Sequence, residues 1–172
     1  MIIDISDIIS NNNQSKEFTC SIDMSDITYN HNSYPIINSK PFELSIANEV
    51  TTLHITCDTS LSVHIPCDRC TKEVEHTFDV VIDKSFKLED DKVVADDEEI
   101  PYFDSGNLDV DMLIFDEILI CWPAKVLCQE DCRGLCPDCG INLNDSTCDC
   151  ASKPKDPRMA KIRDVFREFK EV

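Results

Sequence analysis

The chain has 172 residues, of which 42% are hydrophobic, and it carries a formal net charge of −18. This length predicts one domain, or one domain with a small module, and the acidic excess excludes a surface that binds nucleic acid or anionic membranes over most of its area. The charge is uneven. Residues 151–172 hold seven basic and four acidic residues, so they are +3, and residues 1–150 carry −21.

The cellular compartment follows from the start of the chain and from its cysteines. The N-terminal stretch MIIDISDII has no basic region and carries Asp4 and Asp7, so we do not expect a signal peptide. Asp116 and Glu117 interrupt the longest apolar run, which excludes a membrane span of about 20 residues. The eleven cysteines are an odd number and too sparse for a disulfide scaffold. We therefore expect a cytoplasmic protein with reduced thiols.

Strand patterns occupy the first half of the chain. Residues 11–40 are polar and predict short strands separated by loops. Residues 41–88 alternate apolar and polar side chains, which predicts strands with one buried and one wet face. We expect an antiparallel meander with a tight turn at residues 58–60, and a third strand that runs into Pro66 and Cys67.

An acidic stretch at residues 89–107 separates these strands from a predicted helix. Its charge pattern indicates a solvated or disordered loop, with a site for a cation or a basic partner as the alternative. Residues 109–121 then repeat apolar side chains at three- and four-residue steps. Asp109 or Asp111 can cap this helix and Pro123 ends it. We expect it to be largely buried against the sheet.

The C-terminal segment predicts a second helix. Asp156 and Pro157 provide an N-cap and a first-turn proline, and Arg163, Arg167 and Lys170 lie on its polar face. The predicted fold class is α+β: an antiparallel β-meander packed against a buried helix, a C-terminal Cys-rich module whose closely paired cysteines indicate zinc, and a terminal helix. The predicted domains are a β-rich body with the acidic loop and buried helix (1–123), a zinc-binding Cys module (124–152) and a basic amphipathic helix (153–172).

Eight cysteines occur in close pairs, which indicates bound metal. Six lie in the segment CQEDCRGLCPDCGINLNDSTCDC, residues 128–150, and two lie upstream in PCDRCTKE. We predict that all eight are ligands of two structural zinc ions: Cys67, Cys70, Cys128, Cys132, Cys136, Cys139, Cys148 and Cys150.

Two groupings of these ligands are open. In the favoured one, Cys136, Cys139, Cys148 and Cys150 form a local site whose closure costs little entropy, and the other four form a second site. Gly140 supports the local site, because glycine tolerates the positive φ of a metal knuckle. The competing grouping joins Cys128, Cys132, Cys136 and Cys139 in one site. It leaves the outer pairs, Cys67 with Cys70 and Cys148 with Cys150, to form the other.

Other chemistries are weaker alternatives. Iron also binds four cysteines in such knuckles, and His64 is a possible substitute ligand near Cys67. A redox role for Cys67 and Cys70 is less favoured, because a strand pattern rather than a helix follows them. Cys20, Cys57 and Cys121 have apolar neighbours and are expected in the core. Since eight thiols fill two sites, we expect no open metal position and no enzyme.

The chain resembles the YceD family from about Phe42 to its end. The resemblance is carried by Cys67-Asp-Arg-Cys70, the helix of residues 108–123 ending in Trp-Pro, the segment 127–140, Asn142-Leu-Asn144, Cys148-Asp-Cys150 and Asp156-Pro-Arg158. Trp122 stands where the family usually has another apolar residue. The resemblance implies a role in ribosome biogenesis and the accumulation of large-subunit ribosomal RNA, without a mechanism or catalytic residues.

Charge refines this expected role. A body of −21 should avoid bare RNA and attract a basic partner, which we expect to be a ribosomal protein or a pre-ribosomal particle. Direct RNA contact is expected only through residues 153–172, and no membrane contact is expected. The alternatives are a thiol–disulfide redox protein that uses the CxxC pairs and, less favoured, a metal buffer.

Overall fold

The computed structural model describes residues 1–90, 92–94 and 100–150. Its elements in chain order are β1 (Ile2–Asp4), α1 (Ser6–Ser10), β2 (Ser15–Cys20), β3 (Asp26–Tyr29), β4 (Asn32–Ser39), β5 (Phe42–Asn48), β6 (Thr52–Pro66), β7 (Glu73–Glu89), β8 (Lys92–Val94), β9 (Phe103–Asp104), β10 (Asn107–Asp109) and α2 (Val110–Ile120). Antiparallel sheets, few helices and a Cys-rich segment confirm the predicted α+β class. The predicted C-terminal helix lies outside the described residues.

The described chain divides into two compact units. The body comprises Met1–Pro66 and Glu73–Val126. The second unit joins Cys67–Lys72, the connection between β6 and β7, to the residues that follow Val126. Six of the paired cysteines therefore share a unit with the two upstream ones. The predicted boundaries at residues 123 and 152 stay a prediction.

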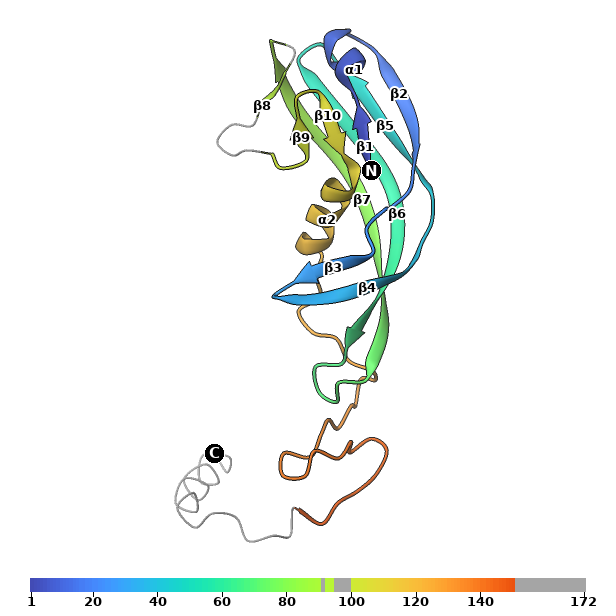
Figure 1. The fold of residues 1–172 in the computed structure, drawn as a ribbon, viewed down its shortest axis with the longest axis vertical. Helices are drawn as coiled ribbons and strands as arrows, with labels where there is room; N and C mark the ends of the chain where they lie inside the picture. The colour runs from blue at the N-terminus through green and yellow to red at the C-terminus, as the bar shows by residue number, and fades with distance from the viewer. Residues whose placement is uncertain (91, 95–99, 151–172) are drawn as a thin grey trace, which may run out of the picture. The chain divides into compact units, whose positions relative to one another are not determined.

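A seven-stranded sheet built around β6 forms most of the described body (Figure 1). β4 and β5 pair with β6, while β7 pairs with β6 and β8. β3 pairs with β4 and β2 with β5, all antiparallel. Pro41 lies between β4 and β5. Because proline has no N–H to donate to a strand ladder, its position fits this break.

β6 corrects one sequence prediction. The tight turn expected at residues 58–60 does not exist, because β6 runs unbroken and pairs with β7 from Thr52↔Lys87 to Pro66↔Glu73. Leu53, Cys57 and Leu61 are buried, and Thr59 is buried on the same parity. Since the two-residue period continues through Asp58 and Ser60, these polar residues lie on the wet face of one long strand.

The core lies on the inner face of the large sheet, which is the face of these buried β6 residues. It is shared with α1, α2 and the small sheet β1–β10–β9. Figure 1 shows α1, α2 and this small sheet together on one side of the large sheet. Ile8 and Ile9 from α1 join the cluster. The sequence prediction did not include α1, which is a single short turn of five residues.

α2 forms where the sequence predicts it. The Asp109 side chain accepts hydrogen bonds from the N–H groups of Asp111 and Met112, at 3.1 and 3.2 Å, and so caps the helix. Four residues of the helix are buried: Val110, Leu113, Ile114 and Ile118. None of the described helices has the length and apolar character needed to cross a lipid bilayer.

The described part of the acidic stretch contains secondary structure. Short strands β8 and β9 fall within residues 89–107, where the charge pattern predicts only a loop, and β10 begins at Asn107. Val93, Ile100 and Phe103 pack against the core. These apolar contacts hold the described part of the segment on the body despite its acidic charge. Most of its acidic run, at position 91 and residues 95–99, lies outside the described residues.

Candidate metal centres

Two chain turns in the second unit have the same backbone geometry. In Cys67–Lys72, the Cys67 N–H donates to the Lys72 carbonyl at 2.8 Å, and the Thr71 N–H donates to the Cys67 carbonyl at 2.9 Å. In residues 136–141, Cys136 donates to Ile141 at 2.8 Å and Gly140 donates to Cys136 at 2.9 Å. The residue after the second cysteine has φ +59° at Thr71 and +74° at Gly140. Each CxxC pair therefore lies on a tight knuckle that turns both thiols to one side.

The first cluster joins the β6–β7 connection to the segment after Val126. Its sulfur atoms, from Cys67, Cys70, Cys128 and Cys132, all lie within 4.8 Å of one another. The Sγ atoms of Cys67 and Cys132 are 3.8 Å apart, and those of Cys70 and Cys128 are 3.4 Å apart. The Arg69 guanidinium donates to the Cys132 carbonyl at 2.7 Å and so holds the two segments together.

The second cluster is local in sequence. The sulfur atoms of Cys136, Cys139, Cys148 and Cys150 also lie within 4.8 Å of one another. Cys136 and Cys150 are buried, Cys148 is intermediate and Cys139 is exposed. The structure thus brings the eight thiols together in the favoured grouping and keeps the competing set of residues 128, 132, 136 and 139 divided between two clusters.

The donor sets fit a tetrahedral ion. Four thiolates at about 2.3 Å from a central zinc have sulfur–sulfur edges of about 3.8 Å, close to the two edges of the first cluster given above. All eleven cysteines are free thiols. Because a tetrahedral tetrathiolate site suits both zinc and iron, this geometry identifies a metal-binding arrangement without choosing the metal.

The ionisation of the thiols has a clear cause in each cluster. The backbone N–H groups of Cys139 and Asp138 lower the pKa of Cys136 to about 7. Burial raises the pKa of Cys67, but the N–H groups of Arg69, Cys128 and Cys70 outweigh it and the pKa falls to about 6.

Neighbouring thiols act in the opposite direction. Interaction with Cys70 raises the pKa of Cys128 to about 12, and interaction with Cys139 raises that of Cys150 to about 12. Four adjacent thiols cannot all ionise without a cation. A divalent ion would therefore displace protons when it binds.

The remaining cysteines and His64 lie elsewhere. His64 is in the body, with its Nδ1 4.0 Å from a Glu73 carboxylate oxygen, and is not part of either cluster. Cys20 and Cys57 are buried as expected, and burial raises the pKa of both. Cys121 is exposed, so its prediction as a core residue is wrong. It is the C-cap of α2, where the helix ends and its apolar stripe no longer faces the core.

The structural roles of three residues of the second unit were not predicted from the sequence. Thr71 adopts a glycine-like φ, although β-branched residues disfavour it. Arg69 clamps Cys132. At Gly134, a Cβ would lie 3.0 Å from the Arg69 carbonyl, so this close approach requires glycine. Gly134 alone had a sequence signal, as one of only three glycines in the chain.

Comparison with known sequences places the chain in a family. The family described as "Large ribosomal RNA subunit accumulation protein YceD" matches residues 55–166, well over half of the chain. The chain belongs to the YceD family. The match includes all eight paired cysteines and begins later than the expected start near Phe42.

Curated relatives of this YceD-family chain carry no described activity. Uncharacterized proteins of Mycobacterium bovis and Mycobacterium tuberculosis are each 29% identical over 108 residues, which cover 58% of this chain and 49% of the relative. An uncharacterized protein of Mycobacterium leprae is 29% identical over 79 residues, or 45% of this chain and 36% of the relative. The match thus covers about half the length of the M. bovis and M. tuberculosis relatives and about a third of the M. leprae relative. No solved structure matches it.

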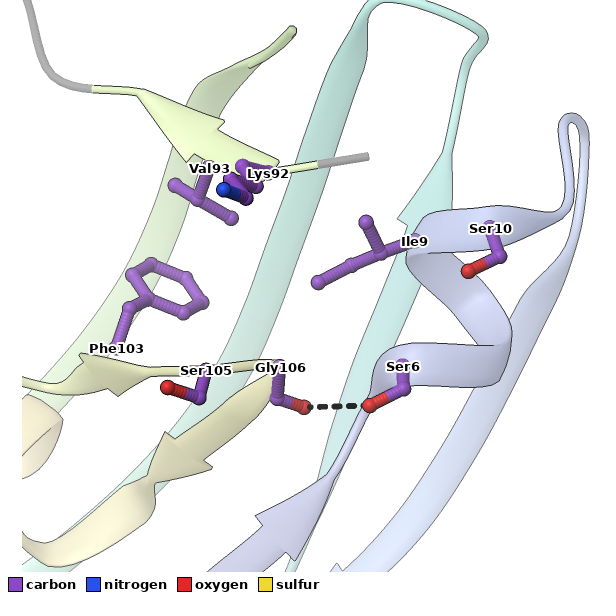
Figure 2. Close-up of a pocket in the computed structure, with 8 residues that line it drawn as sticks. All are labelled: Ser6, Ile9, Ser10, Lys92, Val93, Phe103, Ser105 and Gly106. Carbon is purple, nitrogen blue, oxygen red and sulfur yellow. Dashed lines mark hydrogen bonds between the residues drawn. The ribbon is translucent and has the colours of Figure 1, made fainter. Parts of the chain in front are cut away.

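The body of the YceD-family chain has a cavity of about 490 Å³ beside α1. In Figure 2 the Ile9 side chain points from α1 toward Val93 and Phe103, and the Ser6 hydroxyl faces the Gly106 carbonyl at 3.4 Å. Lys92 is the one charged residue among those that line it. The lining residues offer neither a base for a nucleophile nor a set of metal ligands.

A second hollow, which we call the outer-face groove, lies on the face of the large sheet opposite the core. It is lined by residues of β2, β5, β6 and β7: Glu17, Glu43, Ser45, Thr56, Cys57, Asp58, Val81, Ile82 and Asp83. Four of these carry a carboxylate and none is basic. Val81 of β7 is 68% exposed and pairs with Asp58 of β6 in the ladder.

Proposed function

We propose that this chain is a non-enzymatic zinc-binding factor that supports large ribosomal subunit biogenesis and 23S rRNA accumulation in the cytoplasm. Membership of the YceD family supports the ribosomal role, since the family's description names rRNA accumulation. The two four-thiol clusters support metal binding. We assign one zinc ion to each cluster, with all eight cysteines as ligands.

A structural role suits these ions. Structural zinc sites carry four protein ligands, whereas catalytic sites keep one position for water or substrate. Four thiols per cluster would fill a tetrahedral ion completely. The ions would then fix the β6–β7 connection to the segment around Cys128, and fold residues 136–150 into a closed loop.

A Cys-to-Ser series with metal analysis tests the assignment. We expect two zinc ions per chain, with Cys67→Ser and Cys128→Ser each losing the same ion and Cys136→Ser losing the other. Because Cys121 is exposed and outside both clusters, Cys121→Ser is the matched control and should retain both ions. Iron in place of zinc, or loss of one shared ion by Cys128→Ser and Cys136→Ser, would contradict it.

The partner is proposed to be a basic protein rather than RNA. The observation behind this is the outer-face groove, whose lining includes four carboxylates and the exposed Val81 and no basic residue. A groove of this kind repels phosphate and favours a cationic polypeptide with an apolar side chain. Contact with RNA would be left to residues 153–172, which lie outside the described part of the chain.

Recovery of partners from cells tests this proposal. The tagged chain is compared with Glu17→Gln/Glu43→Gln/Asp58→Asn/Asp83→Asn, which removes the groove charges. The matched control, Asp7→Asn/Asp26→Asn/Glu49→Gln/Asp104→Asn, removes equal charge from exposed sites outside the groove. We expect the groove variant alone to lose a basic ribosomal protein. Recovery of RNA after ribosomal proteins have been stripped off would instead favour direct RNA binding.

The redox alternative rests on the lowered pKa of Cys67, which would favour its thiolate. The turn after Cys70 leads into β7 rather than into a helix whose N-terminus could activate the thiol. An insulin-reduction assay on the zinc-loaded chain separates the two functions. We expect no reductase activity, and turnover that Cys67→Ser abolishes would support the alternative.

A further inference from the structure

Asn144 belongs in sequence to one cluster and contacts the other. It lies between Cys139 and Cys148 of the second cluster, yet its Nδ2 donates to the Cys132 sulfur of the first cluster at 3.3 Å. Both clusters and this loop lie in the second unit. Asn144 is thus a direct side-chain link from the loop of one cluster to a thiol of the other.

The orientation of the Asn144 amide follows from its partners. Its Oδ1 accepts from the Arg133 N–H at 2.8 Å and from the Gln129 side chain at 3.2 Å. Its Nδ2 also donates to the Asn142 Oδ1 at 2.8 Å. A flipped amide would place its oxygen against the Cys132 sulfur and the Asn142 oxygen, so the donor faces the thiol.

Backbone hydrogen bonds also connect the first knuckle to the loop of the second cluster. Leu135 donates its N–H to the Arg69 carbonyl at 3.1 Å, on the knuckle of the first cluster. Gly134 accepts from the Leu143 N–H at 2.9 Å, and Leu135 forms a bridge with Asn142. Residues 134–135 therefore lie between the first knuckle and the loop that carries Asn144.

We propose that Asn144 couples the two metal sites, so that an ion in the second cluster raises the affinity of the first for its own ion. The inference rests on the proposed assignment of metal to both clusters. An ion bound by residues 136–150 closes the loop and fixes Asn144 in place. The side-chain N–H of Asn144 then stabilises the Cys132 thiolate, which is the form that binds metal. By linkage, the first ion favours the second by the same factor.

Zinc competition against a chromophoric chelator, with the full-length chain, tests the coupling. Loss of an outer-shell partner typically lowers metal affinity about 10- to 100-fold. We expect Asn144→Ala to bind two ions with the first site weakened by about this factor. Ser146→Ala, an exposed position in the same loop, is the matched control. Asn144→Asp should weaken the site further, because it keeps the acceptor and sets a negative oxygen against the thiolate.

A double-mutant cycle distinguishes coupling from a local effect. Cys136→Ser/Cys139→Ser removes the second site and should weaken the first, and adding Asn144→Ala to it should have little further effect. The coupling would be overturned if Asn144→Ala bound two ions with unchanged affinity, or if the losses in the cycle were additive. Neither result would contradict the metal assignment. A wild-type chain that binds fewer than two ions would overturn the metal assignment as well.

Discussion

The two knuckles differ at the residue that follows their second cysteine. Gly140 occupies the positive-φ position of the second knuckle, and a Cβ there would meet nothing within 4 Å. Thr71 occupies the same position in the first knuckle, with φ +59°. A left-handed conformation costs an ordinary L-residue about 1–2 kcal/mol, so the first knuckle stores strain that the second avoids.

Thr71→Gly should therefore stabilise the zinc-loaded chain by about 1 kcal/mol, since glycine adopts positive φ at little cost. Denaturant unfolding, followed by zinc release to a chelator, measures the change. Thr147→Gly is the control, because Thr147 has no positive φ and glycine there should destabilise. A loss of stability in Thr71→Gly would mean that the Thr71 hydroxyl, which donates to the Cys70 carbonyl at 2.7 Å, outweighs the strain.

Spacing in the sequence was enough to find the eight thiols and to favour their grouping. It could not find Thr71, because its residue type argues against the conformation it adopts. It could not assign a role to Asn144 either, since that role depends on a contact with Cys132, twelve residues away. Cys121 was misplaced because its helical spacing continues the α2 stripe past the point where the helix leaves the core.

At the scale of elements, β7 presents a lysine to the core side of the sheet. Lys84 pairs with Ile55 in the ladder and contacts the carboxylates of Glu117 at 2.5 Å and Asp116 at 3.4 Å, both on α2. Its ammonium also lies 5.5 Å from the centre of the Tyr102 ring. The lysine side chain is 26% exposed and that of Glu117 only 15%. One cation thus joins α2 to the sheet.

Lys84→Met should destabilise the chain by about 2 kcal/mol near neutral pH, because it leaves the half-buried Glu117 without its cation. Adding Glu117→Gln should recover part of the loss. Chemical denaturation of the single and double variants measures both effects. Equal stability of Lys84→Met and wild type would show that the pair contributes nothing.

The same pair gives a pH dependence. Burial lowers the pKa of Lys84, but its hydrogen bond to Glu117 and the nearby acids outweigh this, and the pKa lies above 10.5. The stabilisation is therefore complete below pH 10.5 and is lost as the pH rises through the raised value. Wild type and Lys84→Met should converge in stability above that pH.

The elements show where periodicity predicts well and where it does not. Alternation located β5, β6 and β7, and Asp109 marked the start of α2. The polar residues Asp58 and Ser60 suggested a turn although the buried parity continued through Thr59. α1 is too short for a helical period to show, and the pairing of β2 with β5 depends on a crossover that local patterns do not encode.

At the scale of the molecule, like charges gather in the outer-face groove, and the described residues that line it include no cation. The formal charge is −18, and four carboxylates share the outer-face groove. Like charges across neighbouring strands are destabilising. Free of a partner, the body is therefore less stable than its core alone would make it, and a cationic partner would relieve the repulsion.

The groove variant described above should consequently be more stable than wild type, by about 1 kcal/mol for the four substitutions together. Added salt should stabilise wild type more than the variant, because it screens the repulsion that the variant lacks. Urea unfolding at low and high salt measures both. A variant that is less stable, or that responds equally to salt, would contradict the repulsion.

The β6–β7 hairpin also has a consequence for the order of folding. Fifteen residue pairs in register converge on the connection Cys67–Lys72, whose turn contains the strained Thr71. Because Thr71 disfavours the positive φ that this turn requires, the turn is a poor nucleus for the pairing of β6 with β7. A metal ion held by Cys67 and Cys70 would shape this turn before the strands meet. We therefore expect metal supplied to the unfolded chain to speed zippering of the hairpin, whereas the same metal added later only slows its opening.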